Sequence, residues 1–118
     1  RRTDLMVHVG DIIYPHFSFG QTDTRLLSVY RDLLRTTPSF FAWGNHDLYA
    51  GAAPLLAALR SPTNNTPAEQ HTAEKTWPES YFSFDAGDAH FAVLFWPYSY
   101  QYYMREGCPQ LEWLEADL

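Results

Sequence analysis

Residues 5–9 read LMVHV, a short and nearly continuous apolar run that Gly10 closes. Residues 39–43 read SFFAW, and Gly44 closes this run in the same way. An apolar run of this length is typical of a strand that is buried on both faces, as in a parallel sheet. Each run therefore predicts a short internal strand.

A helix of roughly three turns or more is predicted between these strands, because Thr22 or Asp23 can cap its first turn. Pro38 prevents it from continuing. The apolar residues expected on its buried face are Leu26, Leu27, Tyr30, Leu33 and Leu34. Strand, helix and strand in this order form a βαβ unit with parallel strands. Both strands then end at one edge of the sheet, where α/β proteins bind ligands.

The rest of the chain predicts one helix, a hairpin and a final helix. The expected elements are a helix over 52–59, strands over 81–84 and 90–96 with a turn at 85–88, and a helix over 110–118. Residues 61–79 are polar and predict an exposed excursion. Pro109 suits the start of the last helix, on which Leu111, Leu114 and Leu118 share one face.

Composition limits the possible classes of function. The chain has 118 residues, 46% of them hydrophobic and 17% aromatic, which suits one domain with a buried core. A net charge of −6 argues against nucleic acid as the main partner. No apolar run approaches the roughly 18 residues of a membrane span, so we expect no membrane partner. The single cysteine, Cys108, excludes an internal disulfide and a cysteine-based zinc site, and we expect its thiol to be inert.

Two polar blocks come directly after the two predicted strands. They read GDIIY (residues 10–14) and GNHD (residues 44–47), and the parallel geometry should bring them together. The side chains that should converge are Asp11, Tyr14, Asn45 and His46. Their oxygens suit Mn, Fe(III) or Mg, and Zn is also compatible. One carboxylate can bridge two cations, and a nearby histidine can protonate a leaving group.

The two blocks resemble those of the calcineurin-like metallophosphoesterase superfamily, and are most similar to its purple acid phosphatase branch. The resemblance implies that Asp11 bridges two metal ions and that Asn45 binds the divalent one. Tyr14 stands where that branch has a tyrosinate bound to ferric iron. It further implies that His46 assists the phosphoryl group and leaving oxygen, and that Asp47 orients His46.

The hairpin residues 81–91 and the helix 110–118 are also similar to segments of this branch. The implied fold is α/β, a β-sandwich flanked by helices and built from βαβ units. The implied activity is hydrolysis of a small phosphate monoester by Fe(III) paired with Fe, Zn or Mn. The resemblance favours a secreted or extracytoplasmic location and leaves the oligomeric state open.

The sequence also departs from the pattern of these relatives. They carry an earlier Asp-x-Gly or Asp-x-His block and two later histidine blocks, none of which is present here. Residues 95–97 read FWP where an aspartate is common. We therefore expect residues 1–118 to be the central part of one catalytic domain and to be inactive alone. The alternatives are a phosphodiesterase or nucleotidase of the same superfamily, and a non-catalytic binding protein on a degenerate fold.

Simpler interpretations apply to single residues. Taken alone, Asp11 could cap the loop after its strand, and residues 45–47 could form an Asx-type turn. We expect His8 to pack in the core or to contact a metal-binding residue without binding the metal itself. We expect His90 to be structural.

Overall fold

The computed structural model describes residues 3–63, 79–95 and 104–118. The contacts divide the chain into two compact units, Arg1–Leu59 and Arg60–Leu118. Most of the predicted polar excursion and the end of the predicted strand at Trp96 lie outside the described residues. Among the described helices, none has the length and apolar character needed to cross a membrane.

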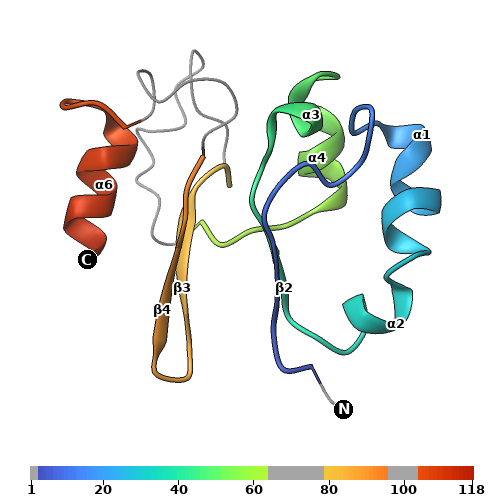
Figure 1. The fold of residues 1–118 in the computed structure, drawn as a ribbon, viewed down its shortest axis with the longest axis horizontal. Helices are drawn as coiled ribbons and strands as arrows, with labels where there is room; N and C mark the ends of the chain where they lie inside the picture. Colours follow the sequence, from blue (N-terminus) through green and yellow to red (C-terminus); the bar gives the residue numbers. More distant parts are fainter. Residues whose placement is uncertain (1–2, 64–78, 96–103) are drawn as a thin grey trace. The chain divides into compact units, whose positions relative to one another are not determined.

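The first unit contains the predicted parallel strand pair. β1 spans Met6–His8 and β2 spans Ser39–Phe41. They pair in parallel, with Met6 opposite Ser39 and His8 opposite Phe41. The two strands run side by side, and the chain leaves both at the same edge (Figure 1). The predicted strand order and direction are confirmed. The expected burial of both faces of β1 is wrong: side chains alternate along a strand, and Val7, on one face, is 37% exposed.

The segment between these strands is a broken helix, so the prediction of one continuous helix is wrong. It consists of α1 (Phe19–Thr22), the π-helix η1 (Asp23–Leu27) and α2 (Arg31–Leu34). The amide of Ser28 donates to the carbonyl of Asp23 at 2.7 Å, and the Ser28 hydroxyl donates to the Asp23 carboxylate at 3.1 Å. A five-residue step of this kind inserts an extra residue and rotates the next turn of the chain off the buried face.

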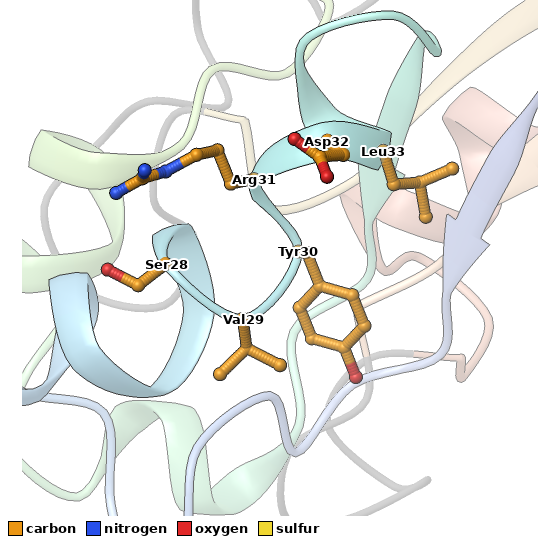
Figure 2. A pocket seen from close by; sticks show the side chains of 6 residues that line it. All are labelled: Ser28, Val29, Tyr30, Arg31, Asp32 and Leu33. Atoms are coloured by element: carbon orange, nitrogen blue, oxygen red, sulfur yellow. The ribbon is translucent and has the colours of Figure 1, made fainter.

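The exposure of the predicted apolar face shows this rotation. Leu26 is fully buried, but Leu27 is 40% exposed and Tyr30 38% exposed. Side chains from Ser28 to Leu33 line a hollow of about 490 Å³ at the break (Figure 2). A second hollow, of about 340 Å³, lies between Phe19 and Leu27 on one side and Pro54 on the other. Neither hollow includes a residue of the two polar blocks.

Two short helices complete the first unit. α3 spans Asn45–Leu48 and begins directly after Gly44. α4 spans Ala53–Ala58, with proline in its first turn, and confirms the predicted small helix. The core of this unit consists of Ile13, Phe17, Leu26, Phe41, Trp43, Leu48, Ala52 and Leu55.

The second unit contains the predicted hairpin. β3 (Phe82–Ala86) pairs in antiparallel fashion with β4 (Ala89–Val93). The turn is narrower than predicted, because Ala86 pairs directly with Ala89. Gly87 has φ 62°, in the left-handed region that glycine adopts without strain. The hairpin is confirmed with shifted bounds.

The last helix, α6 (Pro109–Asp117), begins at the predicted proline. Leu118 is 86% exposed, whereas Gln110 and Trp113 are buried. The Gln110 side chain accepts from the Phe95 amide at 2.7 Å and donates to the Phe95 carbonyl at 3.1 Å. Trp113 packs on Tyr81 with ring centroids 5.1 Å apart. The three leucines share one face of the helix as predicted, with Leu111 and Leu114 half-buried, but a glutamine satisfied by backbone groups takes the most buried position.

These elements make the chain a mixed α/β protein, in line with the expected fold class. Within the residues that the structure describes, each unit has one sheet of two strands. The expected β-sandwich stays a prediction.

His90 joins the hairpin to α6. Its Nδ1 lies 2.7 Å from the Asp85 carboxylate and its Nε2 lies 2.8 Å from the Asp117 carboxylate. Asp117 also accepts from the Ser83 hydroxyl at 2.8 Å. The structural role predicted for His90 is confirmed. Its hydrogen bond to Asp85, followed by that to Asp117, raises the pKa of the imidazole above its ordinary 6.5.

We expect the stability contributed by His90 to be larger in acid. Because the folded pKa is the higher one, the contribution is complete below about pH 6.5 and is lost as pH rises through the folded pKa. The free energy of unfolding of wild type and His90→Gln, measured by denaturant titration between pH 5 and 9, should differ most at the acidic end. His16→Gln, in the first unit, is the matched control. A wild-type advantage that grows with pH contradicts this assignment.

Candidate metal centre

The two polar blocks meet where β1 and β2 end. Gly10 has φ 95° and Asp11 has φ 52°, so two successive left-handed residues turn the chain sharply after β1. Aspartate tolerates this conformation better than most residues. A Cβ on Gly44 would lie 2.2 Å from Asp11 Oδ1 and 2.5 Å from the Asp11 amide nitrogen. The blocks therefore touch at a point where only glycine fits.

Asp11 links the two blocks through hydrogen bonds. Its Oδ1 accepts from the His46 amide at 3.1 Å. Its Oδ2 accepts from the Tyr14 hydroxyl at 2.7 Å. That hydrogen bond is the main cause that raises the pKa of the Tyr14 phenol, followed by burial. The structure thus brings Asp11, Tyr14 and the His46 backbone together, as the parallel strands predict.

Asp47 holds the two loops against each other. Its side chain is fully buried, and its two oxygens accept from the amides of Ile12 at 2.8 Å and Gly44 at 2.9 Å. Burial raises the pKa of this carboxyl group, and these amide hydrogen bonds oppose the rise. Asp47 is the third residue of α3 and reaches back to the amide that precedes the helix.

This arrangement corrects the expected contact between Asp47 and the His46 ring. Within the described residues, the ring's hydrogen-bond partner is the Pro15 carbonyl, 2.7 Å from Nδ1. A carbonyl only accepts, so Nδ1 carries the proton and Nε2 is the nitrogen left for other partners. Asp47 makes no such contact because the helix start commits both of its oxygens to backbone amides, and its role in orienting His46 stays a prediction.

The His46 ring contacts two tyrosine rings. Its centroid is 4.3 Å from that of Tyr14 and 4.7 Å from that of Tyr49. Asn45 donates from Nδ2 to the Tyr49 hydroxyl at 2.7 Å. Tyr49 is absent from the sequence-based set, although its spacing of three and four residues from His46 and Asn45 is the spacing that places side chains together on a helix.

Arg25 is a second residue that contacts the site and was not predicted from the sequence to do so. Its guanidinium donates to the backbone carbonyl of Tyr14. This contact places an exposed positive charge beside the loop that carries Tyr14.

Comparison with known proteins assigns the chain to a family. The profile of the calcineurin-like phosphoesterase family matches residues 1–116. The chain belongs to this family. No curated protein and no solved structure matches the chain.

Calcineurin-like phosphoesterases are metal-dependent hydrolases, so the donor set can be compared with what a metal needs. Asp11 and Tyr14 present two oxygens 2.7 Å apart. The Asn45 side chain donates from its nitrogen to Tyr49, which leaves the amide oxygen to act as a metal ligand. No group of three or more His, Cys, Asp or Glu side chains suited to a metal occurs within residues 3–63, 79–95 and 104–118. The donors that the two blocks present are one carboxylate, one phenol and one amide oxygen, and this donor chemistry fits a hard cation.

His8 lies apart from these donors in β1. Its ring stacks on Phe41 with centroids 5.9 Å apart, and its buried Nδ1 has no hydrogen-bond partner among the described residues. The packed role expected for His8 is confirmed.

Proposed function

We propose that this calcineurin-like phosphoesterase hydrolyses phosphate monoesters at a binuclear metal centre of the purple acid phosphatase type. The observation that carries the proposal is the 2.7 Å contact between the Tyr14 hydroxyl and the Asp11 carboxylate. A tyrosine that merely packed on the loop would not need to direct its oxygen at the aspartate of the first block.

Three side chains of this chain would hold the metals. Asp11 would be shared by the two cations, Tyr14 would bind Fe(III), and Asn45 would bind a divalent Fe, Zn or Mn. When bound, the cations supply Lewis-acid stabilisation of the phosphoryl oxygens and activate the attacking water. The charge of the site supports a role for cations, because Asp11 and the buried Asp47 would otherwise repel a phosphate.

His46 is the group that we assign to the leaving oxygen. Its Nδ1 is committed to Pro15, so a proton can be given only from Nε2. The rings of Tyr14 and Tyr49 restrict the orientation of the imidazole. Asp47 supports this arrangement indirectly by holding the loops that carry Asp11 and His46.

The iron assignment is tested with Tyr14→Phe in the full-length protein. Wild type loaded with iron should show a visible tyrosinate-to-iron absorption band, and Tyr14→Phe should lose it. Tyr30→Phe, at an exposed tyrosine outside the site, should keep the band. Absence of the band from wild type, with only Zn or Mn bound, contradicts the purple branch.

The substrate class is tested by assaying the same preparation with a monoester and a diester. Faster hydrolysis of the monoester is expected. Preference for the diester would identify a phosphodiesterase. Metal binding without turnover of either would identify a non-catalytic binding protein.

A further inference from the structure

Tyr49 contacts two residues of the GNHD block at once. It comes directly after α3 with helical backbone angles (φ −61°, ψ −28°), which places it one turn after Asn45. Its hydroxyl accepts from Asn45 Nδ2 at 2.7 Å. Its ring lies 4.7 Å from the ring of His46 at an interplanar angle of 52°. Tyr49 is nevertheless 57% exposed, so these contacts do not serve the core.

The contact with Asn45 matters because an amide has two unlike ends. Its oxygen can bind a cation, whereas its NH₂ group carries donor hydrogens and cannot. Rotation of the amide by half a turn exchanges the two ends. A partner that accepts from Nδ2 therefore favours the orientation in which Oδ1 is available to a cation. The Tyr49 hydroxyl can donate as well as accept, and in this structure it accepts from Nδ2, which leaves Oδ1 at the opposite end of the amide.

We propose that Tyr49 is a positioning residue, whose hydroxyl holds the Asn45 amide so that its oxygen faces the metal. The proposal rests on the proposed function, since it requires a cation at Asn45. The ring contact with His46 fixes the tyrosine itself, because the side chain packs on one partner while its hydroxyl reaches the other. Groups that orient metal ligands in this way commonly set metal affinity.

The test is a double-mutant cycle in the full-length protein, with Mn²⁺ affinity measured by titration calorimetry. Tyr49→Phe keeps the ring and removes only the hydroxyl, and should weaken Mn²⁺ binding about tenfold. Asn45→Ala should weaken it further. In the Asn45→Ala background, Tyr49→Phe should have no additional effect, because the amide on which it acts is gone. Tyr30→Phe is the matched control and should leave the affinity unchanged.

The outcomes separate this inference from the proposed function. If Asn45→Ala leaves Mn²⁺ affinity at the wild-type value, Asn45 is not a ligand and the proposed metal centre fails together with the inference. If Asn45→Ala weakens binding but Tyr49→Phe does not, only the inference is overturned. It is also overturned if Tyr49→Phe weakens binding equally in the presence and absence of the Asn45 side chain. Melting temperatures of the metal-free variants should match wild type, because the hydroxyl lies at the surface.

Discussion

Asp11→Asn is expected to lower kcat/KM for a phosphate monoester by about 10³-fold or more, because it removes the negative charge assigned to the two cations. Asparagine suits this position structurally. It tolerates the left-handed backbone of Asp11 (φ 52°), and its oxygen can still accept from the His46 amide. The variant therefore separates loss of metal binding from loss of fold.

The measurements for Asp11→Asn are kcat/KM, metal content after purification, and melting temperature. Asp32→Asn, at an exposed position in α2, is the matched control and should behave as wild type. Metal content should fall in Asp11→Asn with little change in the melting temperature of the metal-free protein. An Asp11→Asn protein that retains both its metal and activity within tenfold of wild type would show that Asp11 is not a metal ligand.

Gly44→Ala is expected to destabilise the first unit by about 3 kcal/mol and to disrupt the site. The new Cβ would lie 2.5 Å from the Asp11 amide nitrogen, 2.2 Å from Asp11 Oδ1 and 2.9 Å from Asp11 Cγ. One of these atoms belongs to the backbone, so a side-chain rotation cannot relieve the overlap. The loop carrying Asp11 must move away from β2, and the contact between the two blocks is lost.

Gly20→Ala provides the control for Gly44→Ala. Gly20 lies within α1, and a Cβ there meets nothing within 4 Å. Alanine at this helical position should raise the free energy of unfolding by about 0.5 kcal/mol. In denaturant unfolding, the free energy of unfolding should fall in Gly44→Ala and rise in Gly20→Ala. In metal titration, only Gly44→Ala should lose affinity. Wild-type stability and metal binding in Gly44→Ala would mean that the two loops do not pack as closely as in this structure.

Much of the fold of the first unit could be predicted from the sequence. The apolar runs before Gly10 and Gly44 predict buried strands, and the intervening helix requires them to be parallel. Asp11 then meets the second block because parallel strands end at one edge of a sheet. The order and direction of the strands are predictable because they depend on local apolar pattern and on chain direction. The expected burial of both faces of β1 is wrong, since Val7 is 37% exposed.

The break in the helix could not be predicted in the same way. Periodicity treats every turn as 3.6 residues, but the bond from the Ser28 amide to the Asp23 carbonyl spans five. The buried glutamine of α6 could not be predicted for a related reason. The apolar pattern places Leu111, Leu114 and Leu118 on one face, whereas Gln110 is buried by hydrogen bonds to Phe95, a residue remote in sequence.

The sequence by itself thus determined which residue types line the edge of the sheet and that Gly10 and Gly44 precede them. Tertiary contacts decided which atoms they meet: the Pro15 carbonyl rather than Asp47 beside the His46 ring, and Tyr49 beside Asn45. The physical reason is that strand direction and apolar burial are encoded locally. Hydrogen-bond partners depend on where each donor and acceptor comes to lie after the loops have packed, and the Asp47 carboxylate is already satisfied by the Ile12 and Gly44 amides.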